Sequence, residues 1–330
     1  MADIVLRTEG AAGRITLNRP DKLNALTHGM CLAIEAALDG WSRDDGIALV
    51  LIDAAGEKAF SAGGDLRFIH DAAVAGDYAV PREFWRDEYR LNLKIAEYPK
   101  PVVSLMQGYA MGGGVGIGCH ASHRVVCETS RLAMPECSIG LVPDVGGTWL
   151  LSQAPGHVGE FLALTAGRMG PGDAVFAGFA DHYLPRDRWP ELTAKLARGT
   201  VSAVADMAEP APAASLEGDR GWIDSAFSLG GTGPILEALG EMDFAAPQRG
   251  RCRRQDGNGC PACSALPSVS SQANGAPAAR LSNGFPAAPV HAGFRGACRA
   301  ETAAALPGAV RRAEATGNAA QAPAPSVPPE

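Results

Sequence analysis

The sequence lacks any apolar run of roughly 18 residues, the length that a membrane-spanning helix requires. Its first residues lead into a predicted strand at 4–8, without the basic segment and apolar core of a signal peptide. The net charge of −7 at pH 7 does not suit a protein that binds nucleic acid. We therefore expect a cytoplasmic protein that binds neither membranes nor nucleic acid.

The common nucleotide and metal motifs are also missing. A G-x-G-x-x-G pattern that starts at Gly112 would reach Ile117 at its sixth position, and no G-K-S or G-K-T tripeptide occurs. His120 and His123 are not spaced as in a recognised zinc site, so we interpret them as structural or surface residues. We expect no metal and no cofactor. Four cysteines are interpreted as free thiols of a reducing compartment: Cys31, Cys119, Cys127 and Cys137.

The C-terminal quarter lacks whole residue types. Residues 247–330 contain no Lys, Ile, Tyr or Trp and are dominated by Ala, Pro, Gly, Arg and Ser. Such a segment has too little apolar periodicity to fold. We therefore predict a catalytic domain over residues 1–246 and a low-complexity, disordered tail over 247–330. Because residue types with AT-rich codons vanish together, we hypothesise that a frameshift in a GC-rich gene replaced the natural C-terminus.

The most informative segment that is present covers residues 101–144. Residues 101–108 are short, apolar and rich in β-branched side chains, so we expect a buried strand that ends at a turn. The glycine cluster 112–114 follows, and the small apolar residues after it predict a helix. Unpaired amides at a helix start suit a developing negative charge. Two carboxylates, Glu136 and Asp144, come next, and the combination indicates a site for acyl thioesters.

Hydrophobic patterns along the chain alternate between the periods of strands and helices. Strands are expected over 4–8, 14–17, 48–52, 102–106, 123–127 and 181–184, the first two as a hairpin. Helices are expected over 29–41, 84–97, from 115 onward, 156–163 and 189–196. This alternation indicates an α/β fold.

Three motifs in this order resemble the enoyl-CoA hydratase/isomerase (crotonase) superfamily. They are residues 59–65 (AFSAGGD), 108–114 (GYAMGGG) and 134–136 (MPE), and the resemblance covers residues 3–245. It implies the ββα spiral of the ClpP/crotonase type with C-terminal helices, which in such proteins often support trimers, so we expect a homo-oligomer. Two further segments, 84–92 and 134–147, are most similar to the 3-hydroxyisobutyryl-CoA hydrolase branch.

One position departs from the hydratases of this superfamily. Their first catalytic glutamate lies two residues after the glycine triplet, where this sequence has Gly116. Their second glutamate matches Glu136, and Asp144 stands where they usually carry a small residue. The resemblance therefore implies hydrolysis of 3-hydroxyisobutyryl-CoA to 3-hydroxyisobutyrate and CoA, a step of valine degradation. An enoyl-CoA hydratase or isomerase is one alternative, and a relative that binds acyl-CoA or acts as a scaffold without turnover is another.

The resemblance also implies catalytic roles. The backbone amides of Gly64 and Gly113 would bind the oxyanion of the attacked thioester. Glu136 would either attack the carbonyl or act as the base on a water molecule, and the sequence does not choose between these routes. Asp144 could orient Glu136, bind the 3-hydroxyl group or handle the proton. Two carboxylates in an apolar pocket would titrate as a coupled pair, with one pKa raised.

Binding roles follow from the same resemblance. Glu88 is expected to line the acyl pocket, although an exposed helix carboxylate paired with Arg86 or Arg90 is the alternative. Coenzyme A, a part of the substrate, would lie along two loops at 18–26 and 62–66. The substrate-binding set is Ala25, Ala62, Gly63, Asp65, Leu66, Glu88 and Gly112. Arg19 and Lys22 are either phosphate partners or merely exposed loop cations.

Overall fold

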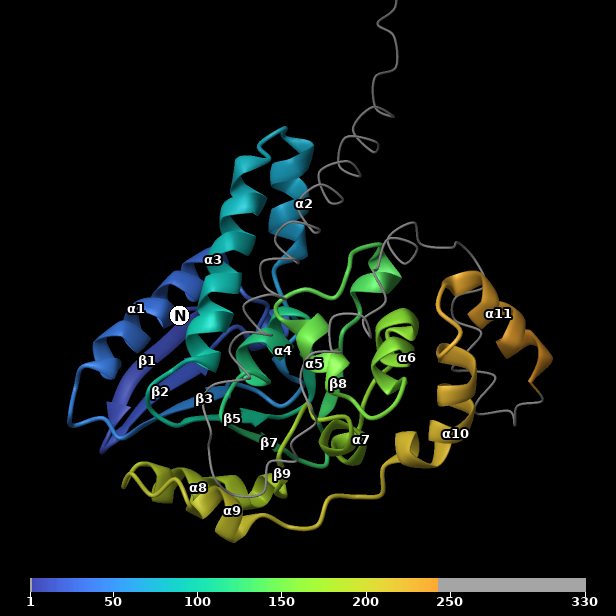
Figure 1. The fold of residues 1–330 in the computed structure, drawn as a ribbon. Helices are drawn as coiled ribbons and strands as arrows, with labels where there is room; N and C mark the ends of the chain where they lie inside the picture. The colour runs from blue at the N-terminus through green and yellow to red at the C-terminus, as the bar shows by residue number, and fades with distance from the viewer. Residues whose placement is uncertain (1, 243–330) are drawn as a thin grey trace, which may run out of the picture.

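The computed structural model of this chain describes residues 2–242 (Figure 1). The predicted tail at 247–330 and its hypothesised frameshift lie outside the described residues. Within the described part, strands and helices alternate from the N-terminus up to the final helices, as the hydrophobic pattern predicts.

The larger of two sheets has six strands. In spatial order they are β1 (Ile4–Glu9), β2 (Ala12–Leu17), β3 (Leu49–Ala54), β5 (Val102–Met106), β7 (His123–Val126) and β9 (His182–Tyr183). The β1–β2 hairpin is antiparallel, whereas every later pair in this sheet is parallel. All five residues of β5 are buried, because helices cover both faces of a parallel sheet.

The smaller sheet is built from three parallel strands of three residues each. They are β4 (Ala59–Ser61), β6 (Tyr109–Met111) and β8 (Arg131–Ala133). Each follows a strand of the larger sheet in the chain, so the unit of two strands and a connection is repeated three times. Because the small sheet is parallel, the loops after its strands all leave from the same edge.

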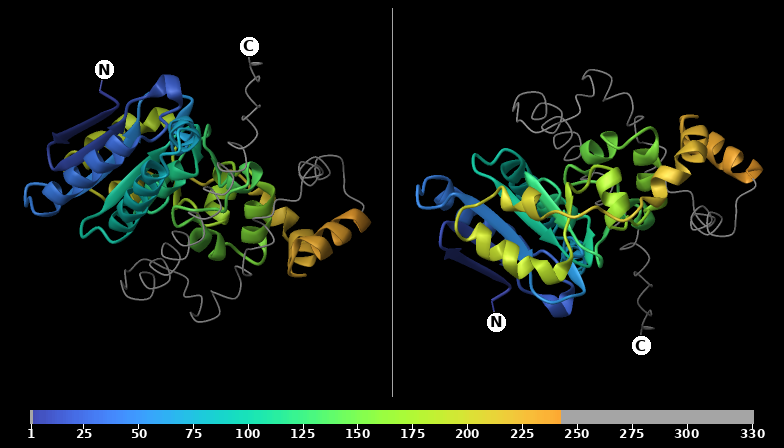
Figure 2. Two further views of the ribbon diagram at one scale, coloured as in Figure 1. Left: turned by 90° about the horizontal axis from the view of Figure 1, so that it is seen from above. Right: turned by 90° about the horizontal axis from the view of Figure 1, so that it is seen from below.

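Helices pack on both faces of the larger sheet, and Figures 1 and 2 show the two layers. On one face lie α1 (His28–Ser42), α3 (Ala79–Ala96) and the short α4 (Gly113–Gly118), around a core that includes Ile34, Phe84 and Leu91. On the other lie α8 (Trp189–Leu196) and α9 (Ala203–Met207), which cover a separate apolar cluster. α1 begins at an ordinary N-cap, since Thr27 Oγ1 accepts from the Met30 amide at 3.2 Å.

The remaining helices surround the edge of the small sheet or extend beyond it. They are α2 (Leu66–Val74), α5 (Gly147–Ser152), α6 (Val158–Thr165), α7 (Pro171–Phe176), α10 (Ser215–Phe227) and α11 (Thr232–Glu241). Three short 3₁₀ turns complete the described part: Pro20–Lys22, Glu136–Ile139 and Arg186–Arg188. Figure 2 shows α10 and α11 at the end of the molecule remote from β1.

Most expected elements are confirmed to within a few residues. The strand at 102–106 and the helix at 189–196 have the expected bounds, and the expected hairpin forms. The expected helix from 115 begins two residues earlier, at the glycines. Sequence patterns did not predict the three short strands, because three residues are too few to reveal a period of two.

Candidate active site

The edge of the small sheet gathers three of the predicted catalytic residues. Gly64 follows β4, Gly113 follows β6 and Glu136 follows β8. The carboxyl ends of parallel strands meet at one edge, so motifs that are 49 and 23 residues apart in the sequence become neighbours. The three motifs therefore follow three neighbouring strands and lie at the same edge of one sheet.

The amides of Gly64 and Gly113 lie next to each other. A Cβ built on Gly113 would lie 3.2 Å from the Gly64 nitrogen, and a Cβ built on Gly63 would lie 3.4 Å from the Gly113 nitrogen. Within residues 2–242, neither amide donates a backbone hydrogen bond. Two adjacent donors with no acceptor in the described chain suit an oxyanion, which is the role that the sequence predicts for them.

Glu136 is brought against the glycine cluster from the third strand. Gly112 has φ +49°, a value that favours glycine, and a Cβ there would lie 2.7 Å from Glu136 Oε1. The Glu136 side chain is buried, with 5% of the residue exposed. It opens the 3₁₀ turn that follows Pro135. The carboxylate therefore lies directly beside the residue that precedes the Gly113 amide.

Helix α3 supplies the opposite wall of the site. Glu88 is 2% exposed, and a Cβ on Gly113 would overlap its Oε1. Arg86 and Arg90 do not pair with it. Both donate to Asp87, so the alternative of an exposed helix ion pair is wrong for Glu88. Burial, and then the nearby charge of Asp144, raises the pKa of Glu88 well above its ordinary value.

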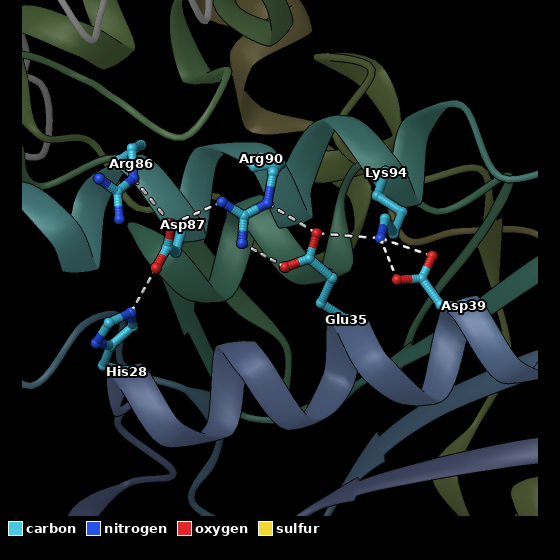
Figure 3. Close-up of polar contacts among 7 residues, drawn as sticks. All are labelled: His28, Glu35, Asp39, Arg86, Asp87, Arg90 and Lys94. Atoms are coloured by element: carbon cyan, nitrogen blue, oxygen red, sulfur yellow. Dashed lines mark hydrogen bonds and ion pairs between the residues drawn. The ribbon is translucent and has the colours of Figure 1, made fainter.

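A ladder of ion pairs fixes α3 on α1 (Figure 3). Asp87 contacts His28 Nε2 at 2.7 Å and Arg90 Nη1 at 2.7 Å. Glu35 accepts from Arg90 Nε at 2.8 Å and pairs with Lys94 at 3.0 Å. Since Asp87 and Glu88 are adjacent on a helix, the charged face of α3 towards α1 sets the direction in which Glu88 points.

Asp144 is held by a residue that the sequence did not single out. The Tyr89 hydroxyl donates to Asp144 Oδ2 at 2.7 Å. Burial raises the pKa of Asp144 to about 6, while the hydrogen bond from Tyr89 lowers it. Asp144 also supplies the charge that acts on Glu88, so Asp144 and Glu88 form a coupled pair. Coupling between Asp144 and Glu136 stays a prediction.

The loop that carries Asp144 has an unusual backbone. Val145 has φ +52°, which is rare for a β-branched residue and marks strain that the surrounding structure must maintain. His120 is buried, and its Nε2 donates to the Val145 carbonyl at 2.7 Å. Burial lowers the pKa of His120 to about 4, so the ring is neutral at pH 7. His120 is thus a structural residue, as expected, and it supports the loop that carries Asp144.

The two loops predicted to hold coenzyme A are joined to each other. Leu26 donates to the Gly63 carbonyl at 2.8 Å, and Asp65 donates to the Leu26 carbonyl at 2.9 Å. Gly64 is therefore tied to the loop that contains Ala25. Ala62 is tied there too, since its amide donates to the Leu23 carbonyl at 2.9 Å.

The predicted cations of these loops differ in their surroundings. Arg19 donates to the Ala25 carbonyl at 2.6 Å and to Asp65 at 3.1 Å, so internal contacts occupy it and it is not merely an exposed cation. Lys22 is exposed. Leu66 begins α2 and is 48% exposed at the outer end of this loop. Lys22 is therefore the better placed of the two cations for a phosphate group.

A separate cavity of about 370 Å³ opens on the other side of the larger sheet. Leu105, Gln107, Arg14 and Trp189 are among its lining residues, and none of the predicted site residues lines it. Over residues 2–242, no cluster of three His, Cys, Asp or Glu side chains could hold a metal ion. The described helices include none that is long and apolar enough to cross a membrane.

Comparisons with known proteins agree with this architecture. The model of the family "Enoyl-CoA hydratase/isomerase" matches residues 12–259. The chain is 46% identical over 191 residues to a protein named 3-hydroxyisobutyryl-CoA hydrolase, mitochondrial, from Gallus gallus. That match covers 58% of this chain and 49% of the relative, so the chain spans about half the length of the curated relatives it matches.

Solved structures show the same likeness. A structure described as an enoyl-CoA hydratase from Rhodobacter sphaeroides 2.4.1 is 53% identical, with a TM-score of 0.71 and coverage of 74% of this chain and 71% of the other. A structure described as a carnitinyl-CoA dehydratase from Mycobacterium thermoresistibile is 36% identical, with a TM-score of 0.74 and coverage of 96% and 91%. The names of these relatives therefore cover both thioester hydrolysis and addition or removal of water.

Proposed function

The chain belongs to the enoyl-CoA hydratase/isomerase family, and from that premise we propose that it hydrolyses the thioester of 3-hydroxyisobutyryl-CoA, a reaction of valine degradation. One observation carries the choice of hydrolysis over hydration. The resembled hydratases have their first catalytic glutamate at the position where this chain has Gly116. In addition, Asp144 places a carboxyl group beside Glu88. The hydrolase name of the curated relatives supports the same choice.

The reaction follows from the arrangement of the site. The thioester oxygen accepts hydrogen bonds from the amides of Gly64 and Gly113 as negative charge develops on it. Glu136 either attacks the carbonyl carbon, giving an anhydride that water then opens, or removes a proton from the attacking water. In both routes the C–S bond breaks, a C–O bond forms and CoA leaves as the thiol after it takes up a proton.

In this proposal Asp144 is ionised and Glu88 is a neutral acid. Asp144, with a pKa of about 6, is mostly ionised at pH 7, and Tyr89 orients it. The raised pKa of Glu88 favours its neutral acid, which can donate a hydrogen bond inside the acyl pocket. Asp144 accepts or passes on the proton of the reaction, and Glu88 contacts the acyl group. Ala62, Gly63, Asp65 and Gly112 line the path of the pantetheine arm.

The test measures release of the CoA thiol from 3-hydroxyisobutyryl-CoA by the purified 330-residue chain, beside hydration of crotonyl-CoA. We expect thiol release without hydration. Glu136→Gln and Asp144→Asn should each lower kcat/KM by at least about 100-fold, because each removes a group that moves protons or attacks. Circular dichroism shows whether the variants fold. Near-normal turnover by either variant would remove that residue from the mechanism.

Two other functions lead to different results in the same experiment. Hydration of crotonyl-CoA would identify a hydratase, the activity named for the Rhodobacter sphaeroides structure. Binding of acyl-CoA by a folded chain with neither activity would identify a relative that binds or acts as a scaffold. A homo-oligomer of the trimer type and a cytoplasmic location stay part of the proposal, although the curated relatives are named as mitochondrial.

A further inference from the structure

Asn92 is the most heavily buried polar side chain of α3, and the reaction above does not use it. The residue is 0% exposed. Neither its Nδ2 nor its Oδ1 has a hydrogen-bond partner among the described residues. An unpaired amide in the interior costs free energy on both its donor and its acceptor side, so such a group calls for a partner of its own.

Gly116 makes room for this amide. A Cβ on Gly116 would lie 2.8 Å from Asn92 Nδ2, 2.9 Å from Asn92 Oδ1 and 2.8 Å from Val145 Cβ. Any side chain at position 116 would therefore displace both the amide and the strained loop. The residue that cannot transfer a proton is also the residue that lets Asn92 approach α4 and Val145, the neighbour of Asp144 in the chain.

The Asn92 amide belongs to the same wall as Glu88. The two residues are four apart on α3, so they lie one above the other on one face of the helix. Glu88 Oε1 is likewise without a hydrogen-bond partner in the described chain, and it lies against Gly113. Unpaired polar groups thus extend along α3, from the glycine that would hold the thioester oxygen to Asn92.

We propose that Asn92 determines specificity by binding the hydroxyl group of the acyl chain. A hydroxyl group donates one hydrogen bond and accepts others, so it can donate to Oδ1 and accept from Nδ2 of one amide. An acyl group with hydrogen or methyl in that place would leave the amide unpaired. This inference rests on the proposed function, because it names the part of the substrate that the site recognises.

The experiment compares kcat/KM for 3-hydroxyisobutyryl-CoA and isobutyryl-CoA, which differ only in the hydroxyl group. The unmodified chain should prefer the hydroxyacyl substrate by at least about 100-fold, since sites that bind a substrate hydroxyl strongly reject its analogue. Asn92→Leu should reduce this preference to below about tenfold, chiefly through slower use of the hydroxyacyl substrate. Retention of the full preference by Asn92→Leu would overturn the proposal.

Two further variants separate this role from a general effect of mutation. Gln107→Leu removes another buried amide with an unpaired oxygen, one that lines the separate cavity and not the candidate site, and should keep the preference. Gly116→Ala leaves Asn92 in the chain but pushes its amide aside, and should lose the preference. An unchanged preference in a folded Gly116→Ala variant would count against the proposal.

A binding measurement keeps this test independent of turnover. Calorimetric titration of the Glu136→Gln variant with the two thioesters gives their dissociation constants without hydrolysis. We expect tighter binding of the hydroxyacyl thioester, and loss of the difference when Asn92→Leu is added. If the unmodified chain hydrolyses neither thioester, the proposed function fails, yet this titration still decides whether Asn92 recognises the hydroxyl group.

Discussion

At the scale of single residues, the surroundings give opposite preferences to two carboxyl groups of the candidate site. Glu88 is driven towards its neutral form by burial and by Asp144, while Asp144 receives a hydrogen bond from Tyr89 that favours its ionised form. Glu136 lies on the other side of the glycine cluster, against Gly112. Carboxyl groups of the same chemical type therefore favour different protonation states within one site.

Tyr89→Phe should shift the pH dependence of the reaction. If ionised Asp144 is required, kcat/KM of the unmodified chain falls as the pH drops through about 6. The Tyr89 hydrogen bond lowers the pKa of Asp144, so its removal should raise that pKa and move the acid limb to higher pH. A pH profile of kcat/KM measures this shift.

Tyr98→Phe is the matched control for Tyr89→Phe. Its hydroxyl donates to the Leu38 carbonyl at 2.7 Å, away from the site, so this variant should leave the acid limb in place. An acid limb that stays unchanged in Tyr89→Phe would mean that the Tyr89 hydrogen bond does not control the titrating group.

At the scale of elements, α3 joins a structural face to a functional face. Its contacts with α1 form the ladder of Figure 3, in which Glu35 pairs with both Arg90 and Lys94. The opposite side of the helix presents Glu88 to Gly113 and Asn92 to Gly116. Because a helix is stiff, a change in the ladder would alter the positions of Glu88 and Asn92.

Glu35→Gln should weaken the packing of α3 on α1. We expect the free energy of unfolding to fall by about 1 kcal/mol, since partly exposed ion pairs are screened by solvent and contribute modestly. The loss of unfolding free energy caused by Glu35→Gln should be smaller in 1 M NaCl, because salt screens the ion pairs. Urea unfolding at low and high salt measures both effects.

Glu191→Gln removes a comparable ion pair at the surface of α8 and should have a smaller effect. Equal losses in both variants would refute a special role for the ladder.

At the scale of the whole molecule, buried titratable groups make stability depend on pH in opposite directions. The pKa of Asp144 is raised from 3.8 to about 6, so the native state holds more protons than the unfolded chain in that interval and gains stability as the pH falls. The pKa of His120 is lowered from 6.5 to about 4, so between these values the unfolded chain holds more protons and stability falls with the pH.

His120→Gln isolates the second contribution. The amide can still donate to the Val145 carbonyl but does not titrate. On going from pH 7 to pH 4, the unmodified chain should lose up to ~3 kcal/mol of stability relative to the variant. Chemical unfolding at a series of pH values measures the free energy of unfolding of both chains. The difference between the two values isolates His120, because the other titratable groups are the same in both chains. Parallel curves would show that His120 does not remain neutral in the native state.

The sequence by itself determined the larger sheet, the main helices and the family to which the motifs belong. Strand 102–106 and helix 189–196 each carry enough apolar residues to show a period. The glycine motifs and Glu136 lie in short segments whose local geometry is decided within a few residues, as the left-handed φ of Gly112 illustrates. These features depend on neighbours in the chain, so they can be predicted from it.

Only the tertiary structure decided how the site is completed. The Tyr89 hydrogen bond to Asp144 spans 55 residues, and Asn92 meets Gly116 from a different helix. The direction of Glu88 depends on the contacts of Asp87 with α1, and the small sheet has strands too short to carry a pattern. Such contacts depend on how separate elements pack together. No single stretch of sequence shows which residues will meet, because each of these contacts depends on where a second element lies in the fold.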